Sequence, residues 1–277
     1  MEVIFEQHEG LKYLFAGPKE SSKAPIVLVH GAFMDAHNWE GNFLEYFAEQ
    51  GHPTYAIFLK DPHHQPYWHT LFAYRIKDYV KQLDKLLAFL TKPAYLVGHS
   101  MGGLIIQKYL SHTDRPALGA CLLASLAPFG MKHTVQLMMR HPQRLLAYTI
   151  LTLQPEWTRP YPAPKGLLAT EVSDQIRKRF QHLTVRESAL ALAGCLWPKI
   201  NKEQVKRTPL LILGAELDSL ALARDVSATG DYYDIPVHIY PDLGHVMMME
   251  TNWVDIAQEI QGHLAGLTLD SHLHKAE

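Results

Sequence analysis

Short, unbroken runs of apolar residues recur along the chain, separated by segments of helical periodicity. The runs lie at 26–29, 55–59, 95–97, 120–123, 210–213 and 237–240. Uninterrupted runs of this length indicate strands buried on both faces, as in parallel sheets. Alternation on either side of Glu9-Gly10 predicts an opening hairpin, which raises the number of strands to eight. Between the runs, apolar residues recur every three or four positions, for example over 80–90 and 253–264. The pattern predicts an α/β fold, with a mostly parallel eight-stranded sheet and helices on both faces.

The segment from 129 to 206 interrupts this alternation. It contains no convincing strand pattern, and helical spacing recurs near 135–139, 145–150, 172–180 and 185–193. We therefore predict that 129–206 is a helical cap inserted before the penultimate strand. Residues 1–128 and 207–277 would together form the core.

One turn between a strand and a helix carries a motif for nucleophilic chemistry. The run at 95–97 leads into Gly98-His99-Ser100-Met101-Gly102-Gly103, and a helical pattern follows. G-x-S-x-G between a strand and a helix is typical of a sharp turn that lifts the serine hydroxyl above the edge of the sheet. The sequence therefore predicts Ser100 as a nucleophile.

A serine hydroxyl needs a base and an orienting acid, which we expect at the ends of other strands. The last run is followed by Pro241-Asp242-Leu243-Gly244-His245, so His245 is the candidate base. The preceding run ends in Gly214-Ala215-Glu216-Leu217-Asp218, and either carboxylate could reach His245. Asp218 lies further into the loop and is the favoured acid.

The loop after the run at 26–29 is expected to help stabilise an oxyanion. Such a site needs two preorganised N–H donors. The Met101 amide directly follows the nucleophile, and the Ala32 amide is the favoured second donor, with Phe33 as the alternative. We assign His30 a structural role in this loop.

These motifs together resemble the α/β-hydrolase superfamily, in its esterase- or lysophospholipase-like bacterial branch. The chain order Ser100, Asp218, His245 is the order that family uses. The resemblance implies an α/β-hydrolase fold and a substrate pocket under the cap. One loop departs from the family, because Lys60-Asp61-Pro62-His63-His64 stands where relatives usually carry a glycine-rich turn.

The pocket walls are expected to come from residues beside these groups and from the cap. Phe33, His99 and Val246 each adjoin one of the predicted site residues in sequence, and Met138 belongs to a methionine-rich cap helix. Methionine adapts to varied apolar shapes, so this cap helix would suit an apolar substrate group. The same methionines could instead pack the cap onto the core.

Composition narrows the partners and the compartment. Lys plus Arg number 26 and Asp plus Glu 28, a net charge of −2 that gives no broad field for nucleic acid or an anionic membrane. No apolar run is long enough to cross a bilayer. Met1 to His8 lacks the apolar run of a secretory signal, and Cys121 and Cys195 sit in apolar surroundings as expected of reduced core thiols. We expect a cytoplasmic protein without stable membrane insertion.

The chain has 17 histidines, three of which, His63, His64 and His69, could be read as a zinc site. No cysteine or H-E-x-x-H pattern supports that reading, and a solvated loop is favoured. No metal or organic cofactor is expected.

The leading hypothesis is a serine hydrolase that cleaves a small or medium, partly apolar carboxylic ester through an acyl-enzyme on Ser100. Cofactor-free C–C cleavage and cyanohydrin lysis could use the same three residues, and a non-catalytic binder of small ligands is a further alternative. Haloalkane and epoxide chemistry is disfavoured, because those relatives carry Asp at the position of Ser100.

Overall fold

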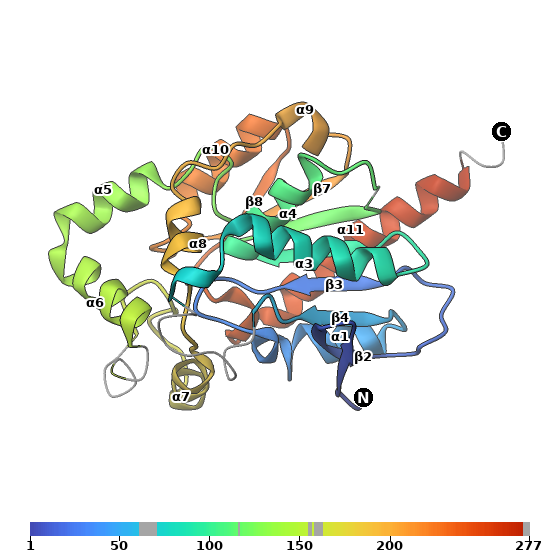
Figure 1. The fold of residues 1–277 in the computed structure, drawn as a ribbon, viewed down its shortest axis with the longest axis horizontal. Helices are drawn as coiled ribbons and strands as arrows, with labels where there is room; N and C mark the ends of the chain where they lie inside the picture. The colour runs from blue at the N-terminus through green and yellow to red at the C-terminus, as the bar shows by residue number, and fades with distance from the viewer. Residues whose placement is uncertain (61–70, 116, 155–156, 158–162, 274–277) are drawn as a thin grey trace.

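A mostly parallel sheet forms the centre of the protein (Figure 1). The structure is a computed structural model, and it describes residues 1–60, 71–115, 117–154, 157 and 163–273. The strands are β1 (Ile4–His8), β2 (Leu11–Ala16), β3 (Ile26–Val29), β4 (Thr54–Ile57), β5 (Tyr95–His99), β6 (Gly119–Leu123), β7 (Leu210–Ala215) and β8 (Val237–Tyr240). The eight-stranded sheet predicted from the apolar runs is therefore confirmed.

The strands follow the order β1-β2-β4-β3-β5-β6-β7-β8 across the sheet. The pairs β1–β2 and β2–β4 are antiparallel, and every later pair is parallel. Strands β3, β5 and β6 lie in the middle, and every one of their residues is buried. This burial explains why these strands read as continuous apolar runs rather than as alternating patterns.

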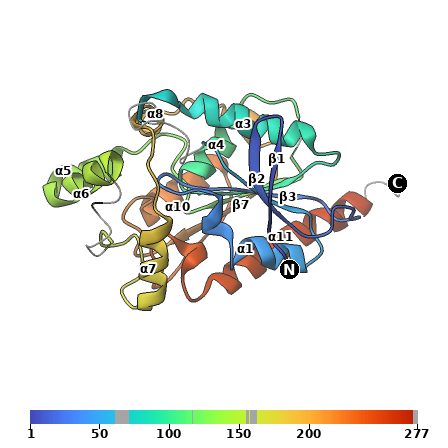
Figure 2. The same ribbon diagram turned by 60° about the horizontal axis from the view of Figure 1, so that its bottom comes forward.

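Helices cover both faces of the sheet, as predicted. The helical elements are η1 (Ala36–Trp39), α1 (Phe43–Glu49), α3 (Ile76–Phe89), α4 (Met101–Leu110), α5 (Lys132–Arg140), α6 (Pro142–Leu153), α7 (Asp174–Leu183), α8 (Ala189–Gly194), α9 (Lys202–Val205), α10 (Ala223–Tyr233), η3 (Met247–Met249) and α11 (Trp253–Leu273). Figure 2 shows α3 and α4 on one side of the sheet and α1 and α11 on the other. A bilayer-crossing helix needs about 20 apolar residues, and no helix in the described residues meets that requirement.

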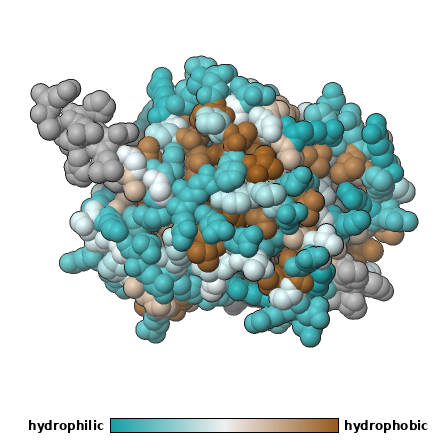
Figure 3. Space-filling model, turned by 180° about the vertical axis from the view of Figure 1, so that it is seen from behind, coloured by the Kyte–Doolittle hydropathy of each residue, from teal (hydrophilic) through white to brown (hydrophobic). Residues whose placement is uncertain are grey.

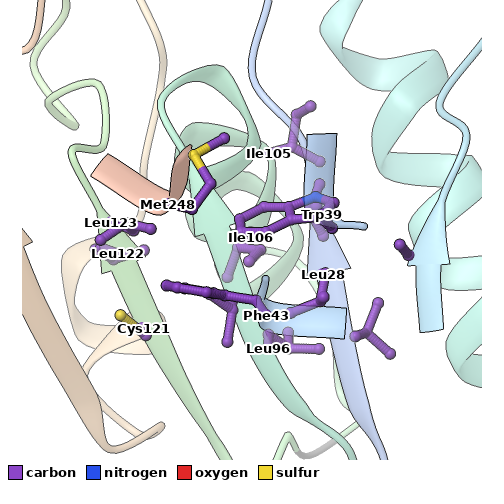
Figure 4. Close-up of a cluster of buried hydrophobic side chains, with 14 of the residues drawn as sticks. Leu28, Trp39, Phe43, Leu96, Ile105, Ile106, Cys121, Leu122, Leu123 and Met248 are labelled. Atoms are coloured by element: carbon purple, nitrogen blue, oxygen red, sulfur yellow. The ribbon is translucent and has the colours of Figure 1, made fainter. Parts of the chain in front are cut away.

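The core is built from the sheet and the helix faces that cover it. Figure 4 shows Leu28 and Leu96 of the central strands among the packed side chains, with Trp39 and Phe43 beside them. Trp39 and Phe43 are fully buried, with ring centroids 5.5 Å apart. Cys121 and Cys195 are buried and unpaired, as the sequence predicted.

The segment between β6 and β7 contains only helices, α5 to α9, in its described part. In Figure 1, α5 and α6 project from one end of the sheet domain, whereas α8 packs against α3 and α7 packs against η1. The helical cap expected before the penultimate strand is therefore present, while the division at 129 and 206 stays a prediction. Some of its apolar side chains, among them Met139 and Leu146, are exposed, and apolar patches interrupt the otherwise hydrophilic surface in Figure 3.

One predicted cap helix begins later than expected. The spacing at 185–193 predicted a helix there, but α8 begins at Ala189. Instead of continuing a helix, the amide of Val185 donates a hydrogen bond to the carbonyl of Phe33 in the core (2.9 Å). A tertiary contact has overridden the local periodicity.

Candidate active site

Ser100 lies on the sharp turn between β5 and α4. Its backbone has φ 54°, in the left-handed region that side-chain-bearing residues seldom adopt. The turn brings Gly102 so close to β3 that a Cβ at that position would lie 2.2 Å from the Val29 carbonyl oxygen. A glycine is therefore required at 102, and the turn holds the Ser100 side chain at the N-terminus of α4.

Three side chains from separate loops form one chain of hydrogen bonds. The Ser100 hydroxyl lies 2.8 Å from Nε2 of His245, and Nδ1 of His245 lies 2.7 Å from Oδ2 of Asp218. All three residues are buried. Oδ1 of Asp218 accepts the amides of Leu220 and Ala221, which leaves Oδ2 directed at the imidazole. With Nδ1–H donating to the carboxylate, Nε2 of His245 can accept the serine proton.

The alternative acid, Glu216, lies apart from this chain of hydrogen bonds. Its side chain is exposed, and its amide donates to the Tyr240 carbonyl (3.0 Å). The structure thus brings together Ser100, His245 and Asp218, the set that the sequence favoured.

The loop after β3 faces Ser100. A Cβ on Gly31 would lie 2.8 Å from Nδ1 of His99 and 3.0 Å from Cβ of Ser100, so any side chain there would force these neighbours to shift. The amide of Phe33 donates to Oε2 of Glu187 (3.3 Å) and is not available to a substrate. The amides of Ala32 and Met101 have no acceptor among the described residues, and both residues line the cavity beside Ser100.

A cavity of about 200 Å³ opens onto Ser100 and His245. This is below the roughly 300–1,000 Å³ typical of sites for drug-sized ligands. The walls are largely apolar; from the core they include Ala32, Phe33, Met34, Met101, Leu126 and Val246, and from the cap Met131, Val135, Met138, Leu151 and Phe180. Three of the four residues expected in the pocket, Phe33, Met138 and Val246, line it.

The fourth, His99, does not line the cavity. Its ring packs against that of His245, with centroids 4.7 Å apart, and its Nε2 lies 2.8 Å from the His245 carbonyl oxygen. Burial, and next the neighbouring His245, holds the pKa of His99 well below its usual range. His99 is therefore a neutral donor that supports the backbone of His245 from behind.

The comparison with protein families decides where this chain belongs. The model of the family described as "Alpha/beta hydrolase family" matches residues 26–259. The chain belongs to the alpha/beta hydrolase family. The match includes β3 and its loop, the Ser100 turn, the cap segment, and the loops of Asp218 and His245.

Solved structures share the fold of this alpha/beta hydrolase at low sequence identity. A carboxylesterase from Nitrososphaera gargenis is 14% identical with a TM-score of 0.73, over 97% of this chain and 100% of that one. An esterase from Thermogutta terrifontis is 17% identical with a TM-score of 0.69, over 96% of this chain and 99% of that one. Naproxen esterase from Bacillus subtilis is 18% identical with a TM-score of 0.66, over 94% of this chain and 90% of that one. Among curated proteins, no sequence matches this chain significantly.

A second carboxylate, Glu250, lies behind the loop of His245. Its Oε1 accepts the amides of Gly244 (3.0 Å) and of Ala169 in the cap segment (3.1 Å). Burial raises the pKa of Glu250 to about 7, against the smaller opposing effect of these two hydrogen bonds. Glu250 thus links the loop of His245 to the cap while it exchanges a proton near neutral pH.

We expect Glu250 to make stability depend on pH. From about pH 4.5 to 7 the folded protein retains a proton that the unfolded chain releases, so the free energy of unfolding falls as pH rises through this interval. Across this pH interval the free energy of unfolding of the wild type should fall by up to about 3 kcal/mol relative to that of Glu250→Gln, whose amide oxygen can still accept both backbone hydrogens. Urea unfolding of both proteins across this interval measures the difference, and parallel pH profiles would contradict the prediction.

One buried ion pair lies outside the set of site residues that the sequence predicted. The carboxylate of Glu187 and the ammonium of Lys60 form an ion pair (2.6 Å) with both side chains fully buried. No local pattern marks these residues, which lie 127 positions apart.

His63, His64 and His69 fall outside the described residues, and within the described ranges no cluster of His, Cys, Asp and Glu is arranged to hold a metal.

Proposed function

We propose that this alpha/beta hydrolase is a serine esterase acting on carboxylic esters of small or medium, partly apolar substrates. The observation that carries the proposal is the hydrogen-bonded chain from Ser100 through His245 to Asp218 at the wall of an apolar cavity. The chain connects a nucleophile, a base and an orienting acid, which acyl transfer requires.

In the proposed first step, the Ser100 oxygen attacks the ester carbonyl while Nε2 of His245 takes the hydroxyl proton. The carbonyl π-electron pair moves to oxygen, and the Ala32 and Met101 amides stabilise the oxyanion. As the intermediate collapses, the bond to the alcohol breaks and His245 gives the proton to the leaving oxygen. Water, deprotonated by the same imidazole, then attacks the acyl-enzyme and releases the acid, restoring the Ser100 hydroxyl.

The size and lining of the cavity support the substrate class. A cavity of about 200 Å³ with apolar walls from both core and cap suits a short apolar acyl or alcohol group. The three fold relatives described above are named as esterases or carboxylesterases, which agrees with ester chemistry on this scaffold.

Active-site labelling combined with a substrate panel tests this function. A fluorophosphonate should modify Ser100, as located by peptide mass spectrometry, and p-nitrophenyl esters should be hydrolysed best when the acyl chain is short to medium. A 1,3-diketone and a cyanohydrin in the same panel test C–C cleavage and lyase chemistry. Failure to label Ser100, or turnover of those two compounds without ester hydrolysis, would reject the proposal.

A further inference from the structure

The cap segment between α7 and α8 inserts a carboxylate into the core of the protein. The side chain of Glu187 is fully buried, and its Oε2 lies 2.6 Å from Nζ of Lys60, which follows β4. Its Oε1 accepts the hydroxyl of Tyr79 on α3 (2.7 Å) and the amide of Ser188 (2.8 Å). One carboxylate therefore joins the cap to two separate parts of the core.

The same carboxylate holds the loop that faces Ser100. Its Oε2 accepts the amide of Phe33 (3.3 Å), and two positions earlier the amide of Val185 donates to the Phe33 carbonyl (2.9 Å). Both backbone groups of Phe33 are thus bonded to the cap. Phe33 has φ 60°, a conformation that costs energy for a residue with a side chain and that persists only where surrounding contacts fix it.

The other end of this loop is held by His30. Its Nε2 accepts the amide of Leu59 (3.3 Å), so its Nδ1 carries the proton and donates to the Gly31 carbonyl (2.9 Å). In a trans peptide the C=O and the following N–H point in opposite directions. Fixing the Gly31 carbonyl therefore directs the Ala32 N–H away from His30, and the hydrogen bonds at Phe33 fix the next peptide.

We propose that Glu187 is a positioning residue for ester hydrolysis: it locks Phe33 so that the Ala32 amide keeps its orientation toward the oxyanion. This role rests on the proposed function. The cap would then supply part of the support for the oxyanion site as well as the roof of the cavity.

The buried charge pair suits Glu187 to this task. A fully buried carboxylate that accepts four hydrogen bonds has little freedom to move, because each displacement leaves a polar group unpaired in a dry interior. Lys60 balances its charge, and loss of either partner alone would leave an uncompensated buried ion. The principal test variant therefore replaces both residues together, as Lys60→Met/Glu187→Gln, and Glu187→Asp is a second variant that keeps the charge but shortens the side chain.

The readout compares two inhibitors of the same shape. A trifluoromethyl ketone that adds to Ser100 forms an oxyanion, whereas the matching methyl ketone binds without forming a stable adduct. In both variants the affinity for the trifluoromethyl ketone should fall about tenfold more than the affinity for the methyl ketone. The value of kcat should fall by a similar factor, with KM little changed. This loss is smaller than the roughly 10²–10³ in kcat that follows when an oxyanion donor is removed outright.

The control variant is His133→Ala, which removes a different contact between cap and core. Nδ1 of His133 lies 2.5 Å from Oδ1 of Asp225 on α10, and His133 does not line the cavity. The ratio of its inhibition constants for the trifluoromethyl ketone and the methyl ketone should match that of the wild type. An unchanged ratio of the two inhibition constants in both Glu187 variants, or an equal change of that ratio in His133→Ala, would overturn the positioning role while leaving the esterase proposal intact. A wild type that neither hydrolyses esters nor prefers the trifluoromethyl ketone would overturn both.

Discussion

Ser100→Ala is expected to lower kcat/KM for p-nitrophenyl esters by a factor of about 10⁵–10⁶. The alanine removes the proposed nucleophile, the hydroxyl oxygen that lies 2.8 Å from Nε2 of His245, while the cavity and the candidate oxyanion donors remain. Any residual rate would come from those donors and from substrate binding. Steady-state kinetics with an ester of the preferred chain length measures the loss.

Ser111→Ala provides a matched control at the other end of the same helix. Ser111 is also buried, its hydroxyl accepts the amide of Asn201 (2.8 Å), and neither residue lines the cavity. This variant should retain wild-type kinetics. Equal activity in Ser100→Ala and wild type would show that the ester is cleaved elsewhere, and the acyl-enzyme mechanism would be abandoned.

Asp218→Asn is expected to lower kcat by about 10⁴ with the fold intact. The amides of Leu220 and Ala221 fix Oδ1 as an acceptor, so the new amide NH₂ must replace Oδ2 opposite Nδ1 of His245. That NH₂ donates and forces the imidazole into the other tautomer, with Nε2–H facing the Ser100 hydroxyl. The histidine can then no longer accept the serine proton.

Glu216→Gln is the control for this prediction, because Glu216 is the other carboxylate of the same loop and is exposed. Its activity should equal that of the wild type. Thermal unfolding should give closely similar midpoints for wild type and both variants, which separates a chemical defect from an unfolded protein. If Glu216→Gln were the slow variant and Asp218→Asn the active one, the assignment of the acid would be reversed.

Much of the fold and the three central site residues could be predicted from local pattern alone. Strands such as β3 and β5 are buried on both faces, so their sequences must be continuously apolar. The turn at Ser100 is equally local: its φ of 54° and the close approach at Gly102 demand particular residues at fixed spacing. Asp218 and His245 follow because parallel strands end at one edge of the sheet, where their loops meet.

The sequence by itself determined the α/β architecture, the helical cap, and the serine, acid and histidine that meet at the sheet edge. Only the tertiary structure decided that His99 lies behind His245, that the residues before Ala189 leave the helix, and that Glu187 pairs with Lys60. Periodicity and turn motifs record constraints between neighbours in the chain. A contact between residues 127 positions apart depends on how separate elements dock, and neither partner's local sequence carries that information.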